Sequence, residues 1–208
     1  MAERGAAEDS SRGLPQLAQD AWPPHGLEAL PVVAAITSVA LGVAVLFAWT
    51  FGVDVLEDVL PWFVRMKANT AIAFILSGLS LALIEHERSG RSTRRVARLL
   101  AAIVVLIALL TLAEYLVGVD IGIDQVLFAD PARTPFPPPG RMAPNGALCF
   151  ALVGAALVLL SSAEVPSRSP TGEAFSGLAL TVSAGSLLGY AYGVHRYGLT
   201  PFSAMPLH

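Results

Sequence analysis

Residues 97–118 read ARLLAAIVVLIALLTLAEYLVG, and their charged side chains are Arg98 near the start and Glu114 near the end. A hydrocarbon core roughly 30 Å thick is crossed by about 20 apolar residues in a helix. Because lipid offers no hydrogen-bond partners, such a stretch must satisfy its own backbone. The sequence therefore predicts that this stretch is a transmembrane helix.

Four further apolar stretches flank this one, at residues 30–52, 68–85, 144–163 and 173–193. The chain has 208 residues, of which 54% are hydrophobic and 14% are charged, a balance that soluble domains rarely show. We therefore predict an all-α integral membrane protein with about five transmembrane helices, whose partner is the lipid bilayer.

The arginines predict the orientation of the chain. The loop between the second and third stretches carries the densest positive cluster: Arg88, Arg91, Arg94, Arg95 and Arg98. Positive loops stay in the cytoplasm, so the amino-terminus is predicted inside and His208 outside. Residues 1–28 are polar and rich in Ala, Gly and Pro, which predicts a disordered cytoplasmic tail before a transmembrane module at 29–208.

An internal repeat divides the module into two-helix units at about 30–85, 97–163 and 173–208. Met66–Gly78 matches Met142–Gly154 at Met, Asn, Ala, Phe and Gly without a gap, and Arg65 and Arg141 precede the two copies. The preceding helices end alike, in Trp49–Asp54, Tyr115–Asp120 and Tyr190–His195. In the third unit Met205 and His208 stand where Met66 and Asn69 stood, so a sixth helix is expected to begin there and the last unit is incomplete.

The repeated positions have structural explanations. Gly after the aromatic end of a helix is the expected left-handed cap. Asn69 and Asn145 can act as N-caps or lie in the first turn of a helix. The aromatic residues of the corners, Trp49, Tyr115 and Tyr190, fit a belt at the outer headgroups. Within the helices, Phe74, Phe150, Gly78 and Gly154 are predicted packing positions.

The repeat also predicts a shared site, because all corners and Met-containing helix starts should lie on the outer face. Helix N-termini there favour an anionic or polar ligand. Arg65, Lys67 and Arg141 oppose the positive-inside bias, so we expect them to have a partner, either phospholipid headgroups or a periplasmic ligand. The candidate positions, for a ligand or for structure, are Arg65, Met66, Asn69, Arg141, Met142, Asn145, Met205, His208, Asp54, Asp120, His195 and Glu114.

Two single features remain open between alternatives. Glu114 is an ionisable group at membrane depth, which indicates function, or it reaches outer water or a headgroup. Its counterparts in the other units, Ala48 and Gly189, carry no charge. Small residues on one face of the fifth stretch predict a packing seam within the chain or in a dimer. They are Gly177, Thr181, Gly185, Gly189 and Gly193.

Several functions are not expected. Paired carboxylates, a phosphate loop and Ser-His-Asp or Cys-His sets are not recognisable, so the chain is predicted not to be an enzyme. Met66, Met142, Met205, His195 and His208 would suit copper, but Pro206 interrupts the only i, i+3 pair, and no metal or cofactor is predicted. Cys149 is the single cysteine, and a net charge of −3 with scattered basic residues argues against nucleic-acid binding.

Four segments of the chain resemble a known family. They are Arg65–Ala71, Gly118–Gln125 with Phe128, Gly140–Asn145 and Gly189–Gly193. They are similar to the multi-pass amino-terminal membrane region of bacterial sensor histidine kinases and diguanylate cyclases, over nearly all of the chain after residue 30. The resemblance implies a multi-pass location in the bacterial inner membrane. In that family the hairpins continue into a further helix and then into cytoplasmic output domains, which these 208 residues do not include; it supplies no ligand residues.

The function expected from the sequence is therefore a membrane-embedded sensory or anchoring module of a signal-transduction protein, present as a truncated or split chain. The alternative is a small structural or accessory subunit of a larger membrane complex. In either case the expected partners are other membrane helices, in a homodimer or a larger complex, and the ligand is unknown.

Overall fold

The computed structural model describes residues 29–52, 66–86, 90–129, 138–162 and 170–191. These residues form five helices and no strand: α2 (Leu30–Phe51), α4 (Ala68–Glu85), α5 (Arg91–Val117), α6 (Pro144–Leu160) and α7 (Pro170–Ala191). The predicted all-helical class is therefore confirmed for the described part of the chain.

The helix boundaries follow from local chemistry and differ from the predicted ones mainly in α5. This helix begins at Arg91 instead of residue 97, so four of the arginines that we placed in a loop lie in its first turns. The ends of α2 and α5 agree with the sequence, because Gly52 (φ 60°) and Gly118 (φ 71°) are left-handed caps. Pro144 is the first residue of α6, where its missing amide costs no helical hydrogen bond.

Three helices, α2, α4 and α5, are long and apolar enough to cross a membrane. Apolar side chains on their outer faces are exposed, as Phe47 (57%) and Leu109 (52%) illustrate. The helix α6 has 17 residues and is shorter, at about 26 Å for a rise of 1.5 Å per residue. These features indicate a membrane protein.

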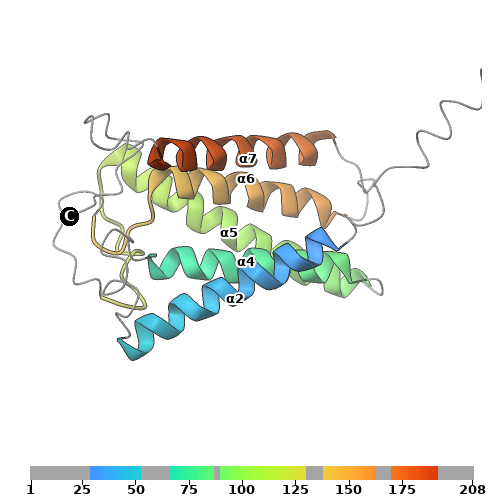
Figure 1. The fold of residues 1–208 in the computed structure, drawn as a ribbon, viewed down its shortest axis with the longest axis horizontal. Helices are drawn as coiled ribbons and strands as arrows, with labels where there is room; N and C mark the ends of the chain where they lie inside the picture. Colours follow the sequence, from blue (N-terminus) through green and yellow to red (C-terminus); the bar gives the residue numbers. More distant parts are fainter. Residues whose placement is uncertain (1–28, 53–65, 87–89, 130–137, 163–169, 192–208) are drawn as a thin grey trace, which may run out of the picture.

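Consecutive helices run antiparallel, as Figure 1 shows. The helices α2, α5 and α7 end, and α4 and α6 begin, at the same end of the bundle, which also holds the loop after α5. We call it the loop end, and the opposite end, where α5 begins with its arginines, the arginine end. In the described part, α4 packs against α2, α5 and α6, whereas α2 contacts only α4 and α7 contacts only α6.

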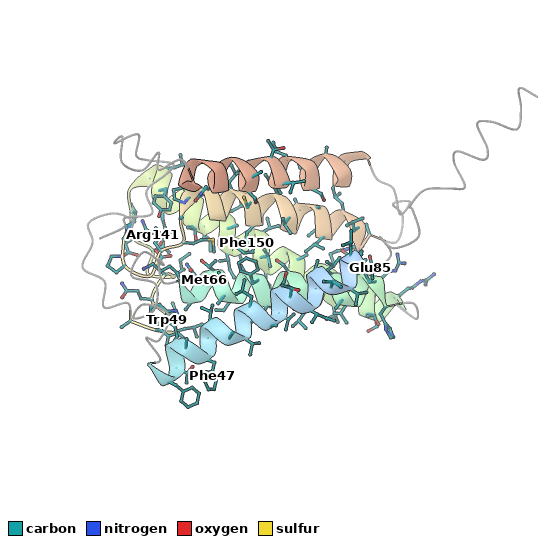
Figure 2. All side chains as sticks on the ribbon, viewed as in Figure 1. Phe47, Trp49, Met66, Glu85, Arg141 and Phe150 are labelled. Carbon is teal, nitrogen blue, oxygen red and sulfur yellow. The ribbon has the colours of Figure 1, made fainter. Side chains whose placement is uncertain are left out.

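The core lies between α4, α5 and α6. The buried residues Ala73, Val104, Ala108, Met142, Ala147 and Phe150 form one cluster. The rings of Phe74 and Phe150, which hold equivalent positions in the repeat, meet edge to face with centroids 5.0 Å apart (Figure 2 labels Phe150). At the arginine end, Arg98 Nη2 donates to Ser161 O over 3.1 Å, which satisfies a carbonyl at the end of α6.

The glycine stripe of α7 is not a seam within the described part of the chain. A Cβ added at Gly177 or Gly185 would meet nothing within 4 Å. Gly189 lies in α7, and Gly193 is outside the described residues. Among the described residues, the intramolecular alternative therefore has no support at Gly177 and Gly185, because α7 turns another face toward α6.

Candidate functional site

A buried network of charged side chains lies at the loop end of the bundle, and a tight turn delivers its cation. In this turn Arg141 N donates to Pro138 O over 3.1 Å. Gly140 has a φ of 75°, and a Cβ there would lie 2.6 Å from Asp124 O. Only glycine fits both the left-handed conformation and this close approach, so Gly140 allows Arg141 to reach the network.

Arg141 meets three carboxylates. Its Nε lies 2.6 Å from Asp124 Oδ2 and 3.3 Å from Glu114 Oε2, and its Nη2 lies 3.5 Å from Asp120 Oδ1. The side chains of Arg141, Asp124 and Glu114 are 5%, 3% and 0% exposed, whereas that of Asp120 is 67% exposed. The single Nε proton points at Asp124, so Asp124 is the closest partner of Arg141.

Asp124 ties the loop to a second helix. Its Oδ1 accepts a hydrogen bond of 3.2 Å from Asn69 Nδ2, and Asn69 lies in the first turn of α4. The carboxylate therefore has a donor on each oxygen, one from α4 and one from the segment before α6. The negative charge of Asp124 therefore lies beside the first turn of α4, where the helix dipole favours an anion.

Glu114 is less well satisfied. Its Oε1 accepts a 2.8 Å hydrogen bond from Ile121 N, which holds the start of the loop against the last turn of α5. Its Oε2 accepts no hydrogen bond from any described residue, although it lies within ion-pair distance of Arg141 Nε. A buried carboxylate oxygen without a donor is costly, so Glu114 depends on the charge of Arg141.

The charge of Arg141 is held firmly. Burial lowers the pKa of the guanidinium, but the hydrogen bond to Asp124 and the charges of Asp124, Glu114 and Asp120 raise it, and the net direction is upward. The guanidinium carbon also lies 5.4 Å from the centre of the Tyr115 ring, a cation–π distance. The network therefore contains a permanent cation.

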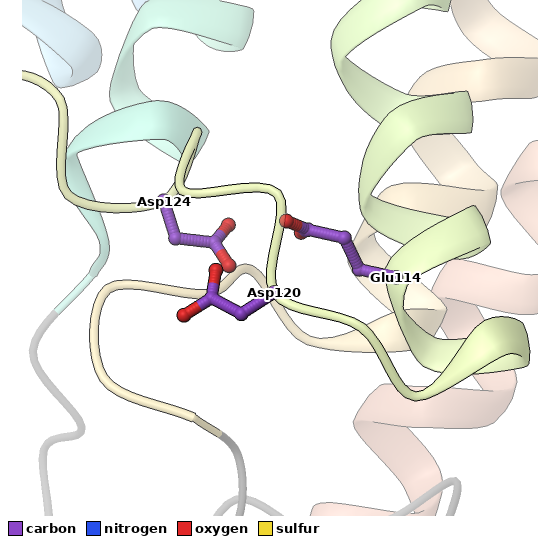
Figure 3. A group of neighbouring side chains, drawn as sticks. All are labelled: Glu114, Asp120 and Asp124. Atoms are coloured by element: carbon purple, nitrogen blue, oxygen red, sulfur yellow. The ribbon is translucent and has the colours of Figure 1, made fainter.

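The three carboxyl groups converge in Figure 3, from the last turn of α5 and the loop that follows it. One oxygen from each of Glu114, Asp120 and Asp124 lies within 4.8 Å of the others, a spacing at which one divalent cation could be held. Arg141 already lies within ion-pair distance of each of these three groups. The residues present therefore fit an internal ion pair better than a resident metal.

Two side chains of this site differ from an interpretation given above. Arg141 has a partner, but its partners are carboxylates of its own chain, where we expected a headgroup or a ligand. Glu114 is 1% exposed, which contradicts the alternative that it reaches outer water or a headgroup and leaves its functional role a prediction. In both cases the cause is the loop after Gly118, which folds back over the end of the bundle and covers these side chains.

The repeat is visible in the hydrogen bonds of the helix corners. Trp49 Nε1 donates to Met66 O over 2.9 Å, and Tyr115 Oη donates to Met142 O over 3.0 Å. The first of these pairs lies at the loop end in Figure 2. These corner aromatics therefore tie each helix end to the start of the next helix of its unit, a role that the predicted headgroup belt does not include.

The repeated asparagines also match. Neither is the N-cap: Asn69 and Asn145 each lie in the first turn of a helix, the second of our two alternatives. Their Oδ1 atoms accept from the next amide, Thr70 N at 2.8 Å and Gly146 N at 2.9 Å. Met142 is 1% exposed in the core, so it is a packing residue and no free thioether ligand.

Several predicted positions lie outside the described residues: Asp54, Arg65, His195, Met205 and His208. Asp124 was not predicted as a site residue, and paired carboxylates were not recognised in the sequence. A signal was present, because aligning Gly52 with Gly118 matches Asp54 and Asp58 with Asp120 and Asp124. Each repeated arginine is thus preceded by two acidic residues at matching positions, and this repeated pair could have identified Asp124 as a site residue.

Comparison with protein families, curated proteins and solved structures found no match for this chain.

Proposed function

We propose that this chain is a membrane-embedded sensory or anchoring module of a bacterial signal-transduction protein, without catalytic activity of its own. In this proposal it resides in the inner membrane, crosses it five times and has its amino-terminus in the cytoplasm. The loop end then faces outward, and the arginine end faces the cytoplasm. The arginines of the first turns of α5 favour this orientation.

One observation carries the proposal: the network around Arg141 joins three parts of the bundle at its loop end. Asp124 connects the loop to α4, Glu114 connects it to α5, and Arg141 stands three residues before α6. A cue that alters this network therefore acts on α4, α5 and α6 at once. Helix shifts of about 1–2 Å are a known means of transmitting such a change.

The resemblance of four segments to the membrane region of sensor kinases and diguanylate cyclases supports the same function. A sensor must have two packing states, one favoured with its ligand and one without it. A ligand shifts the equilibrium between two states only if it binds one of them more tightly than the other. The buried Glu114 Oε2 without a hydrogen-bond donor is a point where the observed packing is not fully satisfied.

A distance measurement tests transmission. Spin labels at Glu85→Cys and Thr171→Cys, in a Cys149→Ala background, report the arginine end, since both positions are exposed there. We expect Arg141→Met to shift this distance by about 2 Å. Phe47→Leu, an exposed change at the loop end, is the matched control and should leave it unchanged. An unchanged distance in Arg141→Met would contradict the sensory role.

Purification from native membranes tests the partner. We expect either a polypeptide heavier than these 208 residues or a histidine kinase or diguanylate cyclase that copurifies. A chain of this length in fixed ratio with a complex that contains no signalling enzyme would instead establish the accessory-subunit alternative.

A further inference from the structure

Glu114 Oε2 is a buried acceptor to which no described residue donates a hydrogen bond. The side-chain donors of the network are engaged elsewhere. Arg141 Nε donates to Asp124 Oδ2, and Asn69 Nδ2 donates to Asp124 Oδ1. Tyr115 Oη donates to a backbone carbonyl. The donor that Oε2 lacks is therefore not one of these groups.

A threonine one turn earlier on α5 does not supply the donor either. Thr111 is 0% exposed, and residues three apart on a helix lie on the same face. Its Oγ1 makes no hydrogen bond with any described residue, whereas Thr50 and Thr181 each donate to the carbonyl four residues earlier. One face of α5 thus buries two polar atoms, Thr111 Oγ1 and Glu114 Oε2, that the surrounding side chains do not satisfy.

The charges at the loop end are also unequal. The charged side chains that the structure describes there are Glu114, Asp120, Asp124, Arg141 and Lys67. Three carboxylates therefore face two cations. Tyr115 is the other titratable group, and the described parts of α2, α6 and α7 bring no charge to this end. Asp124 is bound by Arg141, and Asp120 is 67% exposed to water, so the excess negative charge falls on Glu114.

We propose that Glu114 is a proton-binding site and that a proton from the outer medium is the cue of the sensory module. The proton comes from hydronium, which is left as water, and forms an O–H bond at Glu114 Oε2. Ionised carboxylates only accept hydrogen bonds, so this proton converts Oε2 into a donor. Its acceptors are Asp120 and Asp124, since one oxygen from each of the three carboxyl groups lies within 4.8 Å of the others (Figure 3).

Proton binding changes the balance of the network. Ionised Glu114 is repelled by the two neighbouring carboxylates and is held by Arg141 Nε at 3.3 Å. Neutral Glu114 loses this repulsion, and its Oε1 still accepts the hydrogen bond from Ile121 N that holds the loop against α5. Proton loss therefore weakens the packing of the loop over the bundle, and proton uptake restores it. The exposed Asp120 connects the buried carboxyl group to outer water.

Infrared spectroscopy of the full chain in an ester-free detergent tests proton binding. The spectrum is recorded at about pH 6, where ordinary Asp and Glu side chains remain ionised. We expect the C=O band of a protonated carboxyl group, shifted in D₂O. The band should be absent in Glu114→Gln, whose side chain is neutral and of the same shape. Glu85→Gln, the same change at an exposed position of the arginine end, is the matched control and should retain it.

Absence of the band in the unmodified chain would overturn the proton site without recourse to any variant, and would mean that water supplies the missing donor. A band that persists in Glu114→Gln would place the proton on another residue and overturn the assignment.

The spin labels at Glu85→Cys and Thr171→Cys test the proton as a cue, a part of the inference that rests on the proposed function. We expect their distance to change by about 2 Å between about pH 8 and about pH 6, and not to change in Glu114→Gln. A distance independent of pH would overturn the proton as the cue. The sensory role would then still be decided by Arg141→Met, so the two failures are distinguishable.

Discussion

At Arg141, one guanidinium serves three carboxylates, two of them buried. Such pairs are asymmetric in their energetics. The pair itself adds little stability over apolar packing, but removal of one partner leaves the other charge buried without compensation. The consequences of changing each member therefore differ in size.

Arg141→Met should strongly destabilise the protein. Asp124 and Glu114 would remain buried without their cation, a loss that typically costs about 3–5 kcal/mol. Chemical unfolding in detergent measures it. Arg95→Met, which removes an exposed arginine of α5, is the control and should change the free energy of unfolding by less than about 0.5 kcal/mol. Similar losses in both variants would contradict the network.

The two buried carboxylates should differ in their coupling energy with Arg141. Asp124 is 2.6 Å from Arg141 Nε and is also bound by Asn69, whereas Glu114 is 3.3 Å away with one oxygen lacking a donor. Double-mutant cycles with Arg141→Met should give Asp124→Asn a coupling energy near the top of the usual range of about 0.5–3 kcal/mol, and Glu114→Gln one near the bottom. The reverse order would show that Glu114 is the main partner.

The helix corners are the next level of organisation. In both complete units an aromatic donor at the end of the first helix binds the carbonyl of the repeated methionine. Each corner also ends in a left-handed glycine. The two features together fix where the chain leaves one helix and enters the next.

Trp49→Phe and Tyr115→Phe should each cost at least about 1 kcal/mol, because each removes the hydrogen bond to a methionine carbonyl. Trp49→Phe should cost more, because it also replaces the indole that packs against Phe128 by a smaller ring. The free energy of unfolding of each variant measures this. Phe47→Leu, an exposed change on α2, should cost less than either. If only one of the two variants lost stability, the two corners would not be equivalent in their contribution to stability.

Gly78→Ala and Gly154→Ala should each destabilise by about 1–3 kcal/mol, since the new methyl group would overlap the facing helix and force the pair apart. Thermal unfolding in detergent is the measurement. Gly177→Ala on α7 is a matched helical control with nothing within 4 Å, so its midpoint should not fall. Unchanged midpoints for Gly78→Ala and Gly154→Ala would rule out close crossings.

At the scale of the whole molecule, alternating helices bring both complete corners to one end and the arginines of α5 to the other. The loop end is where segments far apart in sequence meet: Asn69 from the first unit binds Asp124 from the second. The units are therefore coupled at their loops as well as through their helices.

Labelling of cysteines should confirm the orientation. In a Cys149→Ala background, Val126→Cys at the loop end should react with a membrane-impermeant maleimide in spheroplasts, because Val126 is 74% exposed. Ser92→Cys at the arginine end should react only after permeabilisation, as positive segments stay inside. Reaction of Ser92→Cys in sealed spheroplasts would reverse the proposed topology.

The helices could be predicted from the sequence because their signals are local. Apolar length predicted α4 at its observed bounds, and the glycines after Trp49 and Tyr115 predicted where α2 and α5 end. The start of α5 was missed because its first residues, from Arg91 on, are mostly polar or charged. They continue the helix but do not belong to the apolar stretch from which the helix was predicted. The glycines Gly78 and Gly154 were recognised as packing positions, but not which carbonyls they meet.

The amino-acid sequence thus determined the class of the protein, the helix ends and the repeat, since each depends on residues close together in the chain. Only the tertiary structure decided that Arg141 is neutralised by Asp124 and Glu114, because these partners come from different segments and a left-handed turn at Gly140 brings them together. It also decided which face of each helix is covered: Ala101 of α5 is 0% exposed, whereas Leu180 of α7 is 71% exposed. The side that a helix buries depends on its neighbours, and no pattern within a single helix specifies them.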